Sequence, residues 1–208
     1  MRTIVILLSL FVVSVTRAEE FEYWPGASYD PSIPSVEDVL GYASGERITW
    51  HRDAIRYFEA LQAAAPDRVS VHRYGKTWEG RELVYVVVTS AANLARIETI
   101  KANMQALRNA ADTSPDEAER IIAGQPAVTW LSYGVHGNEI SSTDAAMLTA
   151  YHLLAAENDP RVDEILARHA QLAEVAASPD GDDHAPRHNR LGLARQVNAQ
   201  HASRPADP

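Results

Sequence analysis

The sequence predicts an α/β fold in which a mixed sheet is flanked by helices. Valine-rich runs that are typical of strands alternate with segments of helical periodicity. The composition, 46% apolar and 23% charged, is ordinary for a globular protein, and 208 residues are enough to enclose a core. Alternating strands and helices predict a sheet covered on both faces, with ligand sites beyond the carboxyl ends of strands.

The first eighteen residues have the features of a secretory signal. Arg2 gives a positive start, residues 4–15 are apolar, and residues 16–18 offer a small-residue cleavage site. We expect cleavage after Ala18 and a secreted or periplasmic protein. The alternative is an uncleaved, lipid-embedded anchor. The apolar run is too short to cross a membrane as a helix and no later run is longer, so no stable membrane span is expected.

Residues 19–48 are predicted to form an extended N-terminal arm laid over the domain. Prolines interrupt this segment among aromatic and acidic residues: Pro25, Pro31 and Pro34. Because proline disrupts helices and inner strands, a regular element is not expected here. The predicted domain then occupies residues 49–167.

The domain begins with a predicted helix over residues 53–65, ended by Pro66. Its apolar residues recur at three-residue intervals: Ile55, Phe58 and Leu61. Two valine-rich strands follow at 68–74 and 82–89. A glycine stands at each end of the segment between them, which predicts a hairpin.

The second half of the domain repeats this alternation. Helical periodicity continues over residues 94–107, and a short helix is predicted over 116–122. Residues 127–133 have the composition of a strand and lead into a polar loop. Ser141 and Asp144 resemble a capping box that opens the next helix.

The net charge restricts the binding partners of the chain, and the cysteine content restricts the ligands of any metal site. Nineteen basic and 28 acidic residues give a net charge of −9, which opposes binding to nucleic acid. The sequence contains no cysteine, so a metal site must use His, Asp and Glu. These ligands suit zinc, especially a catalytic site with an open coordination position.

His136 and Glu139 lie three residues apart in the polar loop after the last predicted strand. In a tight turn, such a pair can present an imidazole nitrogen and a carboxylate oxygen to one ion about 2 Å from each. The alternative is a capping glutamate beside an ordinary surface histidine.

Two segments of the chain resemble zinc metallocarboxypeptidases of the carboxypeptidase A type. Residues 74–83 read YGKTWEGREL and residues 130–139 read WLSYGVHGNE. The family has a G-K-[ST]-x-x-G-[RK] turn before a central strand, and an H-x-x-E pair as its first two zinc ligands. The similarity covers about residues 50–167. It implies that His136 and Glu139 bind Zn²⁺, and that the substrate is the C-terminus of a peptide or protein.

Residues 168–208 depart from this family. Its third zinc ligand, a histidine, and its catalytic glutamate come from a later portion of the sequence. All 15 aromatic residues lie at or before Tyr151, so the last part of the chain is predicted to be a low-order tail. We therefore expect an incomplete carboxypeptidase-like fold, from a truncated or frame-shifted product.

The tail still contains three candidate site residues. An arginine of the family binds the terminal carboxylate of the substrate, and Arg195 is the candidate for it; the alternative is a coincidental match. His184 and His188 could complete a zinc site with the first pair, or be incidental histidines of a solvated tail.

Three functions are consistent with these residues. The first is zinc-dependent hydrolysis of C-terminal peptide bonds, impaired in this chain. The second is a catalytically inactive secreted fragment or peptide-binding module. As regards turnover by this chain, we favour this second function. The third is a zinc amidohydrolase or deacylase that acts on small amino-acid derivatives.

The other histidines and the tryptophans within the domain and its arm are expected to have structural roles. His51, His72 and His152 show no ligand spacing. The tryptophans are expected to pack in the core or on the sheet: Trp24, Trp50, Trp78 and Trp130.

Overall fold

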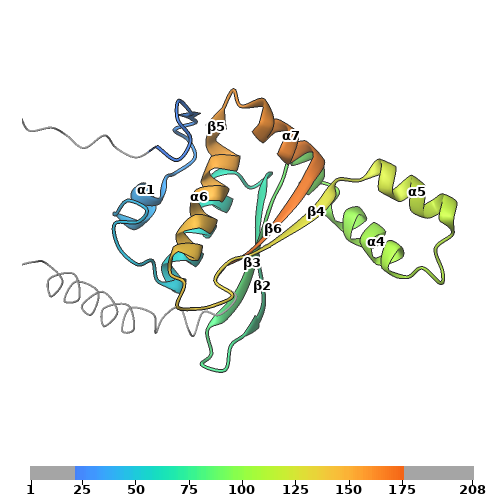
Figure 1. Cartoon of the computed structure of the whole chain (residues 1–208), viewed down its shortest axis with the longest axis horizontal. Coiled ribbons are helices and arrows are strands. Elements are labelled where there is room, and N and C mark those ends of the chain that lie inside the picture. The colour runs from blue at the N-terminus through green and yellow to red at the C-terminus, as the bar shows by residue number, and fades with distance from the viewer. Residues whose placement is uncertain (1–21, 176–208) are drawn as a thin grey trace, which may run out of the picture.

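The computed structural model describes residues 22–175, with a four-stranded mixed sheet at its centre (Figure 1). The strands stand in the order β2-β3-β6-β4: β2 (Val69–Lys76), β3 (Glu82–Val88), β6 (His169–Val175) and β4 (Ala127–Ser132). β3 pairs antiparallel with β2 and β6, and β4 pairs parallel with β6. The predicted α/β class with a mixed sheet is confirmed.

Seven helices accompany the sheet in the described residues. They are α1 (Val36–Leu40), α2 (His51–Ala64), α3 (Ala91–Leu94), α4 (Ile97–Arg108), α5 (Pro115–Gly124), α6 (Ser141–Ala155) and α7 (Pro160–Arg168). The predicted helices over 53–65, 94–107 and 116–122 correspond to α2, α4 and α5. None of the helices in residues 22–175 has the length and apolarity that crossing a membrane would require.

The main core lies between one face of the sheet and helices α2 and α6. Because side chains alternate along a strand, every second residue of β3 points into it. These three valines are at most 2% exposed: Val84, Val86 and Val88. Fully buried side chains of the two helices meet them in the same cluster: Phe58, Leu61 and Met147.

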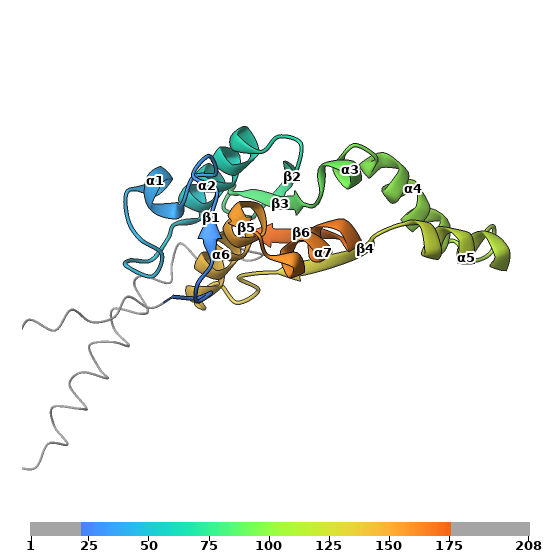
Figure 2. The same ribbon diagram turned by 90° about the horizontal axis from the view of Figure 1, so that it is seen from above.

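Helix α4 lies toward the other face of the sheet. His72 of β2 lies close enough to Lys101 and Glu98, both on α4, for electrostatic interaction with them. Figures 1 and 2 show α4 and α5 extending away from the sheet, far from α1 and α6. Trp130 of β4 is 52% exposed, but its ring lies 6.0 Å from the ring of Tyr85 on β3, so it packs on the sheet as expected. Trp78 projects fully into solvent from a turn, so its expected packing is wrong.

The arm at residues 19–48 is more regular than expected where it is described. It contributes β1 (Ser28–Tyr29), which pairs antiparallel with β5 (Ala156–Glu157), and the helix α1. Ser35 and Asp38 form a capping box for α1, and Val36 and Leu40 enter the core. Local capping and burial therefore overcome the effect of the flanking prolines.

The sheet continues into residues that were expected to belong to the low-order tail. β6 begins at His169 and stands between β3 and β4, where its backbone pairs on both sides. Ala170 is fully buried. The pairing explains the strand, since alanine-rich residues form strands when neighbouring strands supply both ladders. The predicted signal at 1–18 and residues 176–208 lie outside the described part of the chain.

Candidate functional site

His136 and Glu139 lie in the loop that joins β4 to α6. Gly134 has a φ of 65°, a left-handed conformation that glycine adopts without strain and that bends the chain as it leaves the strand. The backbone N–H of Glu139 donates to the carbonyl of His136 at 3.0 Å. This four-residue turn places both side chains on the same side of the loop, as the spacing predicted.

The two side chains meet at the surface. His136 Nδ1 lies 3.2 Å from Glu139 Oε1, and the side chains are 71% and 58% exposed. Two ligands bound about 2 Å from a tetrahedral zinc ion are separated by about 3.3 Å. The distance between these atoms therefore fits a shared zinc ion, and their exposure leaves room for further ligands.

Within residues 22–175, no cluster of three or more His, Cys, Asp and Glu residues could hold a metal ion. His136 and Glu139 are thus a pair of donors in this part of the chain. Arg195, His184 and His188 lie outside the described residues.

The helix after the loop of His136 and Glu139 is held by a contact that the sequence did not predict. Ser141 is the first residue of α6, Ile140 is the N-cap, and no side chain caps the helix, so the expected capping box is wrong. Asp144 instead accepts a hydrogen bond from Thr49 Oγ1 at 2.6 Å. Burial raises the pKa of Asp144, and the contact ties the start of α6 to the segment before α2.

The GKTWEGR motif forms the turn of the β2–β3 hairpin. The N–H of Gly80, whose φ is 84°, donates to the carbonyl of Thr77 at 3.0 Å. The N–H of Thr77 donates to the carbonyl of Arg81 at 2.8 Å. Arg81 also pairs with Glu79. The motif therefore positions the start of β3.

Three further histidines have structural partners. His51 is buried and its Nε2 lies 2.8 Å from the carbonyl oxygen of Glu82. The ring of His72 stacks on Tyr85, with centroids 4.8 Å apart. His152 is buried at the other end of α6 and stacks on Trp24 at 3.9 Å.

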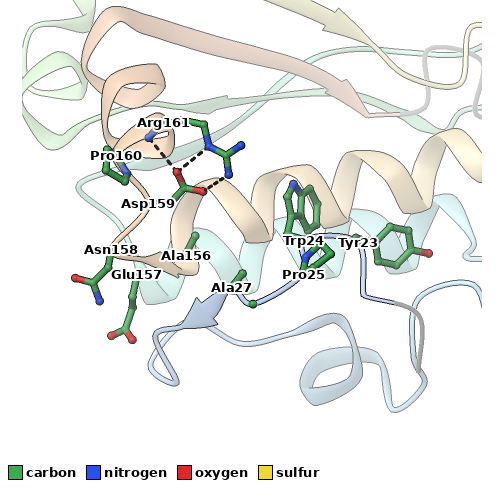
Figure 3. A pocket seen from close by; sticks show the side chains of 11 residues that line it. Tyr23, Trp24, Pro25, Ala27, Ala156, Glu157, Asn158, Asp159, Pro160 and Arg161 are labelled. Carbon is green, nitrogen blue, oxygen red and sulfur yellow. Dashed lines mark hydrogen bonds and ion pairs between the residues drawn. The ribbon is translucent and has the colours of Figure 1, made fainter. Parts of the chain in front are cut away.

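A cavity of about 570 Å³ lies beside this stacked pair (Figure 3). It is lined by the arm around Trp24 and by the segment that leads from β5 into α7. Arg161 Nη2 pairs with Asp159 Oδ2 at 3.0 Å in the wall that this segment forms. The cavity is at the opposite end of α6 from His136 and Glu139, so that pair is not part of it.

Comparison with known protein families gives a match that includes the loop of His136 and Glu139. A model of the zinc carboxypeptidase family matches residues 54–207. None of the curated protein sequences matches the chain.

Among solved structures, the chain is similar to carboxypeptidase A from Helicoverpa armigera (19% identity, TM-score 0.45), over 72% of this chain and 32% of that one. It is also similar to thrombin activatable fibrinolysis inhibitor (13% identity, TM-score 0.47), over 74% of this chain and 30% of that one. A third match is bovine thrombin-activatable fibrinolysis inhibitor in complex with tick carboxypeptidase inhibitor (14% identity, TM-score 0.40), over 67% and 34% of the two chains. The chain thus spans about a third of the length of these structures.

Proposed function

This chain belongs to the zinc carboxypeptidase family, and on that premise we propose that it acts in zinc-dependent hydrolysis of C-terminal peptide bonds, with His136 and Glu139 as zinc ligands. The observation that carries the proposal is the 3.2 Å separation of His136 Nδ1 and Glu139 Oε1. This pair lies within the residues that the family model matches.

Each residue of the pair contributes differently to metal binding. His136 would donate the Nδ1 lone pair of a neutral imidazole, so protons compete with the metal for this atom. Glu139 would supply a carboxylate oxygen and offset part of the charge of the ion. A bound zinc ion polarises a carbonyl group and activates water for hydrolysis.

The loop preorganises the side chains of His136 and Glu139 for metal binding. The turn from His136 to Glu139 fixes their spacing, and the N–H of Ser142 donates to the carbonyl of Glu139 at 3.1 Å, which joins the turn to α6. Gly137 is buried between the two exposed donors, so the backbone can pack tightly beneath them. Less conformational entropy is then lost when the metal binds.

The proposal is tested by measuring zinc in the purified full chain by elemental analysis and by calorimetric titration. We expect His136→Ala and Glu139→Gln each to weaken zinc binding by more than about tenfold, since even outer-shell partners contribute that much. His72→Ala and Glu157→Gln are the matched controls, and they should bind zinc as the unaltered chain does. Unchanged zinc binding in both site variants would refute the assignment.

Release of the terminal amino acid from an N-blocked dipeptide tests the reaction itself. Any release should depend on zinc and should be abolished by 1,10-phenanthroline. Stoichiometric zinc without any release would limit the function to metal-dependent peptide binding. Release of an acyl group from an N-acylated amino acid would instead indicate the deacylase reaction.

Arg195 is proposed to bind the terminal carboxylate of the substrate. It lies within the range that the family model matches, and a guanidinium group binds a planar carboxylate through two hydrogen bonds. Arg195→Lys should raise KM more than it lowers kcat. An unchanged KM would refute this role.

Export is proposed from the signal-like residues 1–18, which combine a positive start, an apolar run and a small-residue site. Sequencing the N-terminus of the protein from the extracellular or periplasmic fraction should give Glu19 as the first residue. Recovery of the chain with Met1 from a membrane fraction would indicate the uncleaved anchor.

A further inference from the structure

A cavity of about 240 Å³ lies between the arm and the first turns of α2. Three arginines line it, two from α2 and one from the segment before it: Arg47, Arg52 and Arg56. The other charged side chain in the lining is Asp53, and the aromatic rings of Tyr42 and Trp50 form part of the wall. The metal pair His136 and Glu139 is not part of this lining.

Two of the guanidinium groups rest on aromatic rings. Arg47 Cζ lies 3.8 Å from the centroid of Tyr42, and Arg52 Cζ lies 5.5 Å from that of Trp50. A cation–π contact uses the face of the guanidinium plane and leaves its N–H edge free for an acceptor. Within residues 22–175, neither Arg47 nor Arg52 forms an ion pair with a carboxylate.

The tyrosine ring under Arg47 is buried and hydrogen-bonded. Tyr42 is 5% exposed, and its hydroxyl donates to Thr49 Oγ1 at 3.2 Å. Thr49 in turn donates to Asp144 of α6. These contacts hold the Tyr42 ring in place, and the ring in turn orients the guanidinium group of Arg47. Arg47 therefore loses less side-chain entropy when it binds a ligand.

The charge in the cavity is unbalanced. Three arginines face one carboxylate, and Asp53 lies 4.0 Å from Arg56 Nη2. Arg56 Nη2 also donates to the carbonyl of Val39 at 3.4 Å. The excess positive charge lies beside the N-terminal turn of the 14-residue α2, where the helix dipole adds to it. This local excess in a chain of net charge −9 favours an anionic ligand.

We propose that this cavity binds a tetrahedral oxyanion of the phosphate class, either free phosphate or a phosphate monoester. A carboxylate has two oxygens, which one guanidinium fork can satisfy. Three guanidinium groups around one small cavity match an anion with three or four acceptor oxygens. Arginine also suits phosphate better than lysine does, because its donors are held in a planar fork. The site goes beyond the proposed peptidase function and does not depend on it.

Titration of the full chain with inorganic phosphate tests the proposal, by calorimetry and by the fluorescence of tryptophan. Sodium chloride and sodium acetate at matched ionic strength are the reference anions. We expect saturable binding of phosphate and no saturable binding of chloride or acetate. Absence of saturable phosphate binding, or equal binding of acetate, would overturn the proposal.

Arg47→Gln combined with Arg52→Gln should weaken phosphate binding by about a hundredfold, at about tenfold for each charge-assisted contact. The matched control is Arg120→Gln, whose side chain is 72% exposed on α5, and it should bind phosphate normally. If circular dichroism shows that the double variant is unfolded, Arg52→Gln alone serves, with an expected loss of about tenfold. Normal binding by the folded variant would refute the site.

Titration with glycerol 3-phosphate separates the two sources of the anion. Tighter binding than that of inorganic phosphate, lost in the same arginine variant, assigns the site to a monoester. Equal or weaker binding assigns it to free phosphate. Monoester binding that survives in the arginine variant would contradict the assignment of these residues.

Discussion

Among single residues, His152 joins the arm to α6 through two contacts. Its ring stacks on Trp24 with planes 4° apart, and its Nδ1 lies 3.1 Å from the hydroxyl of Tyr29. Burial lowers the pKa of His152, while the charges of Asp159 and Arg161 act on it in opposite directions. The neutral ring is therefore the form that the folded chain stabilises.

This lowered pKa predicts a loss of stability in acid. The unfolded chain takes up a proton at His152 near the ordinary value of 6.5, but the folded chain does so only at lower pH. The contribution of His152 is thus fully present above pH 6.5 and is lost as the pH falls below it. In urea denaturation, His152→Phe should show a weaker decline in unfolding free energy between pH 7.5 and 5.5. An unchanged decline would contradict this role.

The contact between Thr49 and Asp144 gives a second prediction for single residues. Thr49→Val keeps the shape of the side chain but removes the hydroxyl that donates to the half-buried carboxylate. We expect the free energy of unfolding to fall by at least about 1.5–3 kcal/mol, the usual contribution of a hydrogen bond to a charged group, because the hydroxyl of Tyr42 loses its acceptor as well. The same substitution in an Asp144→Asn background should cost less, and equal costs would show that the two side chains are not coupled.

The sequence predicted part of the site at this scale. The three-residue spacing of His136 and Glu139 follows from local turn geometry, and the structure brings the two together. The partner of Asp144 could not be predicted, because Thr49 is remote in the sequence and reaches it only through tertiary packing. The arginine cavity was missed although its lining residues all lie within 40–56, because no pattern in this stretch shows that the end of the arm folds beside α2.

Among the elements, α3 is joined to the end of α7 by the side chain of Asn93. Its Nδ2 donates to the carbonyls of Leu166 at 3.1 Å and Ala167 at 3.0 Å. It also donates to Thr89 Oγ1 at 3.2 Å, at the end of β3. Asn93 is 3% exposed, so its amide group satisfies acceptors that water does not reach.

Replacing Asn93 by alanine should therefore loosen the junction between α7 and β6. We expect a loss of about 1–3 kcal/mol in unfolding free energy, because buried carbonyls lose their donors. Hydrogen exchange should increase most at residues 166–170. Asn103→Ala on α4 is the control and should change stability by less than about 0.5 kcal/mol. Exchange that increases evenly over the whole chain would argue against a local junction.

The strands and helices differ in how far the sequence determines them. α2 and the β2–β3 hairpin follow from apolar periodicity and from glycines at the turn, which are local signals. β6 was missed because its alanines, polar residues and charge give no β-branched run, and pairing with β3 and β4 determines it instead. β6 thus forms because of tertiary pairing and not because of a local sequence pattern.

For the whole molecule, the core between the sheet, α2 and α6 dominates stability. Leu61 is fully buried in this cluster, so Leu61→Ala should lower the free energy of unfolding by about 2–5 kcal/mol through lost burial and a residual cavity. Ile122→Ala, at a side chain that is 64% exposed, should change it by less than about 0.5 kcal/mol. Equal effects in urea denaturation would contradict this location of the core.

The position of β6 also sets the order in which the chain can assemble during synthesis. β6 is the last strand of the described chain, yet it stands between two strands made before it. The hairpin and β4 therefore emerge from the ribosome without a common neighbour, and their backbone edges stay open until residue 175 follows. Sheet closure is consequently a late, non-local step of folding.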